Sequence, residues 1–537
     1  MELTNFSLIY PNEKSKQEHL EGICVPDIDM YTLQELGLLE IFDLKSATLS
    51  DYFTTDIEVM KYRMGIFRDM MDNPAISETF NKVIPIVQDI TELRRLESDS
   101  GDADDYLSSI TEIELYISCI DILNSGLSQV KDNVKSQAFK ILTQRITELA
   151  ESEYYAELNR KLSELTRRVR EIKSVTVGVN LDSQLRPTGA GVLAVNSEAF
   201  KSGDALDKIL RLNFKDDEYT CIASLVPFSK KQSENQKIAM SNAFNSAISD
   251  VYRSSLRSWK KIVQSYVLEN TDFLIELMPE IEFVVKGAAL MSELSQRGFD
   301  LCTPTFAELD ERKFEAVELY NPVVAMKLPK GEDIVGNDIS FSKEDALIYI
   351  LTGPNRGGKS VITCAIGIGV AMMQLGLFFP AKSVCVSPAD AIYTHFPTGA
   401  DDTIDKGRLG EECARLVEIF DNVTRYSLVL LDESLSSTGS YEGSYIASEV
   451  IAGLAIVGCR ALFATHLHEL ASEIDRINEV SKAKNGSYID TLVAGIDEGK
   501  RSFKIVRAKP DGKSYARDIA DRYGLTFDKI IDKIDKQ

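Results

Sequence analysis

The sequence lacks the features of several large classes of protein. Among its 537 residues there is no apolar run of about 18 residues, so we expect no transmembrane helix and no membrane partner. The first residues lack a basic segment followed by an apolar stretch, which argues against a signal peptide. The eight cysteines include no Cys-x-x-Cys pair, and four histidines are too few for a multi-histidine zinc site. We therefore expect free thiols and a cytoplasmic protein.

Positive charge is also scarce. With 83 acidic and 60 basic residues the formal net charge is −23, whereas proteins that hold nucleic acid by their overall field are basic. Any DNA contact must therefore be local. Residues 173–232 contain eight Lys or Arg and seven Asp or Glu, a net charge of +1, which leaves −24 for the rest. A contact with a polyanion and ordinary variation of charge both remain open for this segment.

Periodicity divides the chain into a helical part and an α/β part. Two long stretches without Pro or Gly, 128–172 and 229–278, predict two long helices, and short strand patterns near 175–226 separate them. From residue 345, buried-strand runs alternate with helical stretches, which indicates a mainly parallel sheet. The predicted segments are a helical core (1–127), an outgoing lever helix (128–172), a β-rich clamp-like module (173–232), a returning lever helix with the rest of the core (233–319), and an α/β domain (320–537).

The strongest motif is Gly353-Pro-Asn-Arg-Gly-Gly-Lys-Ser360, which satisfies GxxxxGK[ST]. It follows a predicted strand, 347–351, and precedes a helical run, 361–375, so a chance glycine-rich turn is disfavoured. Backbone amides and the helix N-terminus would bind phosphate. Lys359 would contact the β- and γ-phosphates of ATP, and Ser360 would ligate Mg²⁺. The predicted nucleotide contacts are Gly353, Pro354, Asn355, Gly357, Gly358, Lys359, Ser360 and Val361.

Two further predicted strands end in polar residues. The run 427–431 ends in Asp432 and Glu433, and carboxylates at the end of a buried strand are costly unless a cation or a substrate uses them. We expect Asp432 in the Mg²⁺ shell and Glu433 as the base that orients or deprotonates water; a helix cap is the alternative. His466 follows the strand 461–464, where a γ-phosphate sensor competes with a structural histidine.

A fourth element, Gly407-Arg-Leu-Gly-Glu-Glu412, precedes the Asp-Glu strand. Two glycines that open a helix make an anion site, although this signal is weak alone. The order of phosphate loop, glycine pair, Asp-Glu strand and histidine strand is that of ABC-type ATPases. In those proteins the glycine segment acts on the partner subunit's nucleotide, which assigns Gly410 to a contact in trans.

These motifs together resemble the MutS family of DNA mismatch-repair ATPases, over about residues 320–535. Residues 30–320 resemble the family by architecture only. The stretches that carry the resemblance are Tyr320-Asn-Pro-Val-Val324, Val335-Gly-Asn-Asp338, Ile350–Ser360, Ile392–Asp402, Leu428–Glu433, Ser437–Gly443, Phe463–Leu470 and Lys513–Ala516.

The chain also departs from the family pattern. There is no room for the family's mismatch-reading and connector domains, and Arg408-Leu-Gly-Glu-Glu412 replaces its "RSTF" segment. The resemblance implies an adenine contact at Ile334, where the family has an aromatic residue.

The sequence predicts a multidomain protein with an all-α core, lever helices, a clamp and an ABC-type ATPase domain. As a homodimer with ATP and Mg²⁺ it would hydrolyse ATP and couple this to DNA that it reads by shape, such as branched or recombination structures. A repair or recombination protein is a possible further partner. The alternative is an ATP-driven switch on a protein partner without DNA. An SMC-like or transporter ATPase is disfavoured.

Overall fold

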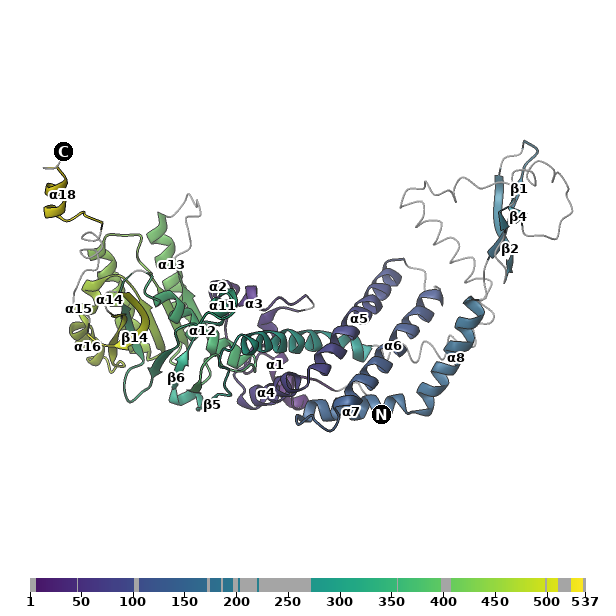
Figure 1. Cartoon of the computed structure of the whole chain (residues 1–537), viewed down its shortest axis with the longest axis horizontal. Coiled ribbons are helices and arrows are strands. Elements are labelled where there is room, and N and C mark those ends of the chain that lie inside the picture. Colours follow the sequence, from purple (N-terminus) through teal and green to yellow (C-terminus); the bar gives the residue numbers. More distant parts are fainter. Residues whose placement is uncertain are drawn as a thin grey trace. The chain divides into compact units, whose positions relative to one another are not determined.

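The computed structural model describes most of the chain (Figure 1). The described residues are 6–45, 47–100, 106–170, 174–184, 187–196, 201–202, 220–221, 272–354, 356–396, 407–497, 500–509 and 523–534. Most of the predicted clamp and returning lever helix lies outside these ranges, as do Asn355 and the Lys513–Ala516 stretch. The fold is mixed α/β, with two compact units: 1–6, 73–134 and 139–281 form the first, and 7–72, 135–138 and 282–537 form the second. The structure thus groups residues 7–72 with the α/β region, whereas the five-segment division remains a prediction.

The first unit is built mainly of helices. They are α5 (Pro74–Ser100), α6 (Tyr106–Val130), α7 (Gln137–Ala150) and α8 (Glu153–Arg170). Buried aromatic side chains fill the space between them. The ring centroids of Phe80 and Phe139 lie 6.1 Å apart, and the buried Tyr155 hydroxyl donates to Asp121 at 2.8 Å. Two short sheets follow, β1 (Ser174–Leu181) antiparallel to β2 (Pro187–Asn196), and β3 (Lys201–Ser202) parallel to β4 (Thr220–Cys221).

The predicted uninterrupted helix over 128–172 is wrong. The range holds the end of α6, then α7 and α8, with turns at 131–136 and 151–152. Ser152 explains the second break, because its hydroxyl accepts a hydrogen bond from the backbone N–H of Tyr155 at 3.1 Å, which caps the start of α8. The absence of Pro and Gly did not exclude breaks, since a serine can end one helix and begin another.

The second unit contains two sheets and the helices that cover them. Its helices include α1 (Glu13–Leu20), α2 (Met30–Glu35), α3 (Leu38–Ile41), α4 (Ile57–Asp72), α11 (Pro322–Lys327), α12 (Lys359–Gln374), α13 (Gly407–Asn422), α14 (Ser440–Val457), α15 (His468–Ser472), α16 (Ile474–Lys482) and α18 (Phe527–Ile534). The smaller sheet has the strand order β5 (Thr305–Phe306), β9 (Ser383–Val386), β6 (Phe314–Leu319), β7 (Asn337–Phe341).

The larger sheet confirms the expected parallel arrangement. Its order is β10 (Ile392–His395), β11 (Leu428–Asp432), β12 (Arg460–Ala464), β8 (Ile348–Thr352), β13 (Ile489–Asp497), β14 (Lys500–Arg507). Every neighbouring pair is parallel except β13 and β14. Asp432 pairs with Ala464, and Ala464 pairs with Leu351, so β8, β11 and β12 end level with one another. We call this end of the sheet the carboxyl edge.

The strands of this sheet form because they are buried on both faces. All five residues of β8, β11 and β12 are buried, and so is nearly every side chain of α12. A Cβ atom at Gly367 would lie 2.7 Å from side-chain atoms of Leu36 and Leu430, so this glycine lets α12 pack closely between α2 and β11. In the part of the chain that the structure describes, none of the helices has the length and hydropathy to cross a bilayer.

Candidate functional site

The predicted phosphate loop lies at the carboxyl edge, between β8 and α12. Gly353 has φ +140° and Gly358 has φ +95°, which are conformations that favour glycine. A Cβ atom at Gly353 would lie 2.7 Å from the Cβ atom of Ala494, so a side chain there would clash. Gly358 precedes the first residue of α12, and the free amides of that helix end face the loop. The loop is therefore a glycine-dependent turn between β8 and α12, as expected, and phosphate binding there stays a prediction.

Lys359 is held inside this loop. Its Nζ atom donates to the carbonyl oxygen of Gly353 at 3.1 Å and lies 3.3 Å from Oε1 of Glu433. The lysine side chain is only 5% exposed. Around this buried ammonium lie two backbone carbonyls and one carboxylate, and a phosphate could replace the carbonyls because its charge would make the stronger contact.

Asp432 has the properties expected of a metal ligand. Burial raises its pKa to about 6, the Glu433 charge adds to this, and Ser360 and Lys359 act in the opposite direction. Its Oδ1 atom is buried and makes no hydrogen bond. An unsatisfied buried carboxylate oxygen beside the Ser360 hydroxyl fits Mg²⁺, which prefers oxygen ligands and usually keeps several waters. The described residues include no cluster of three or more His, Cys, Asp or Glu that could hold a metal ion, and Ser360 and Asp432 stay predicted Mg²⁺ ligands.

Glu433 connects Lys359 with the third strand end. Its carboxylate pairs with Lys359 on one side and with Nδ1 of His466 on the other. The Glu433 side chain is 22% exposed and that of His466 is 48% exposed, so both can reach a molecule that enters from solvent. The backbone of Glu433 has φ +51°, a strained conformation for a residue with a side chain.

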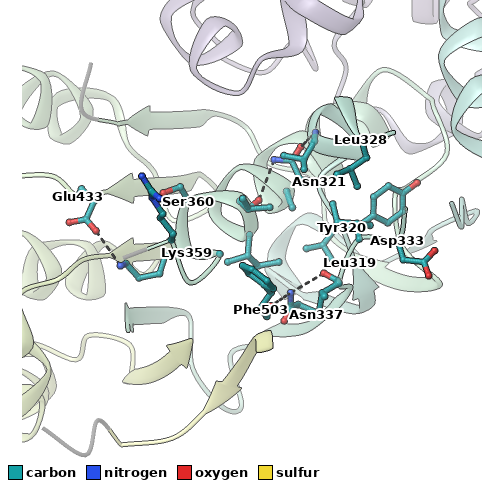
Figure 2. Close-up of a pocket in the computed structure, with 18 of the residues that line it drawn as sticks. Leu319, Tyr320, Asn321, Leu328, Asp333, Asn337, Lys359, Ser360, Glu433 and Phe503 are labelled. Carbon is teal, nitrogen blue, oxygen red and sulfur yellow. Dashed lines mark hydrogen bonds and ion pairs between the residues drawn. The ribbon is translucent and has the colours of Figure 1, made fainter. Parts of the chain in front are cut away.

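A cavity of about 740 Å³ opens beside these residues (Figure 2). Figure 2 shows Lys359, Ser360 and Glu433 at one end, Leu319 and Tyr320 toward the other, and Phe503 between them. The predicted site residues that line it are Ile334, Gly358, Lys359, Ser360, Val361, Glu433 and His466. The charged end can hold phosphates and the apolar end can hold a flat ring, within the size range of small-molecule sites.

Not every predicted contact lines this cavity. Gly353 and Pro354 contribute carbonyl oxygens near Lys359, but neither they nor Gly357 nor Asp432 lines the cavity. Gly410 lies on α13 and is exposed, away from the cavity lining. Its predicted contact in trans therefore remains a prediction. Asn355 is outside the described residues.

Sequence reasoning assigned no role to two further residues that line the cavity, Phe503 and Asn337. Phe503, on β14, lines the cavity with φ +56° and is 45% exposed. It lies where the pairing of β13 and β14 is irregular, which turns its ring toward Gly358. The Asn337 amide fixes this turn, because its Nδ2 donates to the Phe503 carbonyl at 3.2 Å and its Oδ1 accepts from the Ile505 N–H at 2.7 Å. No local pattern predicts a strand irregularity 150 residues after the loop it serves.

Comparison with known protein families covers both parts of the chain. Residues 349–523 match MutS domain V, and residues 55–297 match the MutS2 N-terminal domain. The first of these ranges contains the phosphate loop and all three polar strand ends.

Curated relatives match the same region. A DNA mismatch repair protein MSH3 of Cryptococcus neoformans is 37% identical over 177 residues, which are 33% of this chain and 14% of the relative. DNA mismatch repair protein MutS of Leptospira interrogans is 30% identical over 215 residues, 38% of this chain and 25% of the relative. MutS of Salinibacter ruber is 37% identical over 169 residues, 30% of this chain and 18% of the relative. The chain thus spans a quarter or less of the length of these relatives.

Proposed function

Because the chain belongs to the MutS family, we propose that it binds ATP with Mg²⁺, hydrolyses it, and couples hydrolysis to the binding of DNA. One observation carries this proposal: Lys359, Ser360, Glu433 and His466 line a single cavity, and Asp432 lies beside Ser360 at the end of β11. A phosphate-binding cation, two metal-ligand candidates and a possible base at one edge of a parallel sheet are the parts that phosphoryl transfer to water requires.

The triphosphate would lie across the phosphate loop, with backbone amides and Lys359 as its donors. Gly353, Gly357 and Gly358 keep the loop backbone open to it, and the start of α12 adds the positive end of a helix dipole. Lys359 would exchange its contact with Glu433 for the β- and γ-phosphates. The base would lie against Ile334, Val361 and Phe503 at the apolar end of the cavity.

Ser360 and Asp432 would hold Mg²⁺, which when bound neutralises charge on the phosphates. Once Lys359 binds phosphate, the Glu433 carboxylate is free to accept a hydrogen bond from the attacking water. His466 would hold that carboxylate from its other side, or contact the γ-phosphate as a sensor. Release of Glu433 by the substrate itself would limit hydrolysis to the loaded site.

We further propose a homodimer in which Gly410 and the neighbouring 407–412 segment contact the partner subunit's nucleotide. Gly410 is exposed at the first turn of α13, as such a contact requires. ATP would then control closure of the dimer, and helices of the core would transmit closure to the predicted clamp at 173–232. The names of the relatives, DNA mismatch repair proteins, support DNA as the ligand. We propose shape readout of branched DNA, since such readout needs no contact with base edges.

The experiment that tests this function is the ATPase rate measured with duplex, branched and mismatched DNA, and without DNA, at several salt concentrations. We expect stimulation that is strongest with branched DNA and declines steeply with salt, because phosphate contacts release counterions. An ATPase that no DNA stimulates would favour the second candidate, an ATP-driven switch on a protein partner. The net charge of −23 supports this candidate.

Glu433→Gln tests the assignment of the base. This variant should bind ATP, turn over slowly and accumulate as a dimer with ATP bound, which size-exclusion chromatography with light scattering measures. Glu344→Gln is the matched control, because Glu344 is an exposed residue of the same unit away from the cavity. Equal hydrolysis rates in the two variants would remove Glu433 from the role of base.

A further inference from the structure

The turn that carries Glu433 is unusual in its backbone. Glu433 has φ +51° and Leu435 has φ +64°, so two residues with side chains adopt left-handed conformations on either side of Ser434. Both conformations are unfavourable for residues that carry a Cβ atom. Conformations of this kind persist only when the surrounding structure fixes them, and they cluster at functional sites.

Ser434 supplies one such constraint. It is 1% exposed, and its hydroxyl lies 2.6 Å from Nδ1 of His395 and 3.1 Å from the His395 carbonyl oxygen. A serine hydroxyl has one hydrogen, which it donates to the carbonyl. The ring Nδ1–H therefore donates to the serine oxygen, and this assigns the tautomer.

His395 is a rigid anchor for this contact. It is the last residue of β10, the strand beside β11, and is 5% exposed. Burial, and to a lesser extent the positive charge of Arg415, lower the pKa of His395 to about 4, so the ring is neutral at physiological pH. Its two hydrogen bonds to one side chain tie the ends of two neighbouring strands together.

Two other contacts hold the rest of the turn. The Glu433 N–H donates to the Ala464 carbonyl at 2.8 Å, which joins the turn to β12, and the Leu435 side chain is completely buried in the core. The turn is thus fixed by hydrogen bonds to β10 and β12 and by the Leu435 side chain in the hydrophobic core. Both side chains are buried and neither lines the cavity, so we assign neither of them a direct contact with the nucleotide.

We propose that His395 and Ser434 are positioning residues, whose paired hydrogen bonds hold the strained turn so that the Glu433 carboxylate faces the phosphate loop. This proposal rests on the proposed ATPase function. The loss of either hydrogen bond would leave ATP binding intact, because Lys359, Ser360 and the loop belong to other elements. It would slow the step that depends on the carboxylate's position.

The test compares four variants. Ser434→Ala removes the acceptor; His395→Asn keeps a donor where Nδ1 was, whereas His395→Gln extends its amide to the far side of the ring. Ser448→Ala is the matched control, because Ser448 is also a buried serine and donates only within α14, to the Tyr445 carbonyl at 2.7 Å. Turnover, affinity for ATP and deuterium exchange of the amides at 432–436 are measured for each.

We expect kcat to fall about 10- to 100-fold in Ser434→Ala and His395→Gln, with the affinity for ATP nearly unchanged. His395→Asn should recover most of the wild-type kcat, and Ser448→Ala should not lose it. Amides at 432–436 should exchange faster in the two impaired variants only. If kcat is unchanged in folded Ser434→Ala, or if kcat and ATP affinity fall together, the positioning role is wrong.

Failure of the proposed function gives a different result. A wild-type protein that hydrolyses no ATP under any condition contradicts the ATPase itself. The exchange measurement then still decides about the turn: equal exchange at 432–436 in wild type, Ser434→Ala and His395→Gln overturns the positioning role, and faster exchange in both variants but not in His395→Asn supports it.

Discussion

The two ends of the strands in the six-stranded sheet differ in the hydrogen bonding of their buried polar groups. At the carboxyl edge, Asp432 has a buried oxygen without a hydrogen bond, and Glu433 has a strained backbone. At the other end, where the same strands begin and which we call the amino edge, Arg460 is also buried. Its two terminal nitrogens donate to four backbone carbonyls, those of Lys313, Ser387, Pro388 and Tyr426, and only its Nε atom is buried without a partner.

The amino edge continues this pattern with Asp390. Its carboxylate accepts hydrogen bonds from the hydroxyls of Thr424 and Ser427. Burial lowers the pKa of Arg460 only to about 10, so the guanidinium stays charged at neutral pH. Each of its four hydrogen bonds to carbonyls is therefore charge-assisted. Polar groups at this edge join loops to the sheet.

The difference separates stability from chemistry within one sheet. Polar atoms that already have partners hold the fold, whereas polar atoms without partners are available to a ligand. The comparison predicts that substitutions at the carboxyl edge change turnover with little loss of stability, and that substitutions at the amino edge do the reverse.

The largest effect is expected for Lys359→Ala. Removal of the ammonium takes away the main charge for the phosphates, so ATP hydrolysis should fall by about 10²- to 10³-fold. The melting temperature should stay close to that of the wild type, since Lys359 contacts only loop carbonyls and Glu433. Steady-state kinetics and thermal unfolding measure the two quantities, with Lys343→Ala, an exposed lysine paired with Asp310, as the control. Wild-type turnover in Lys359→Ala would remove the phosphate loop from the site.

Arg460→Met tests the amino edge. The substitution leaves four buried carbonyls without their donor, and we expect the free energy of unfolding to fall by about 3–5 kcal/mol. The protein that remains folded should bind ATP as the wild type does. Urea unfolding and ATP titration measure this, with Arg425→Met as the control, because Arg425 is exposed at the same edge and stacks on Tyr426. Loss of ATP affinity without loss of stability would contradict the assignment of the amino edge to stability.

His395 lies at the carboxyl edge but should also affect stability, through pH. Its pKa is about 4 in the folded protein, against the ordinary 6.5. The unfolded chain therefore takes up a proton below pH 6.5 that the folded chain refuses until about pH 4, and stability falls as the pH falls. The slope is about 1.4 kcal/mol per pH unit, so the loss over this window approaches about 3 kcal/mol.

His395→Asn should lack this component. Urea unfolding of both proteins between pH 7 and pH 4 measures it as a difference, which cancels the other titrating groups. Parallel curves for the two proteins would contradict the burial of a neutral His395. A steeper curve for the wild type would show that one residue of the carboxyl edge serves stability as well as position, and would sharpen the boundary between the two roles.

The carboxyl edge was predictable because each of its elements is local in the sequence. The phosphate loop, Asp432 with Glu433, and His466 each follow a recognisable buried strand, and parallel strands bring their ends together. The Ser434–His395 pair and Phe503 were not predictable, because they depend on a turn of unusual backbone and on an irregular strand pairing. The break before α8 escaped for a related reason: Ser152 is an ordinary residue in a helix until its hydroxyl caps a backbone amide.

Phe503 gives the smallest expected effect and the finest test of the cavity. If a base stacks on its ring, Phe503→Ala should raise the KM for ATP about tenfold, the value of about 1–3 kcal/mol for one base on an aromatic ring. Binding of inorganic triphosphate should not change, because the charged end of the cavity is intact. Val506→Ala, an exposed position on the same strand, is the control for β14. Equal losses of affinity for ATP and for triphosphate would mean that Phe503 supports the loop through Gly358 rather than the base, and the apolar end of the cavity would then bind no ring.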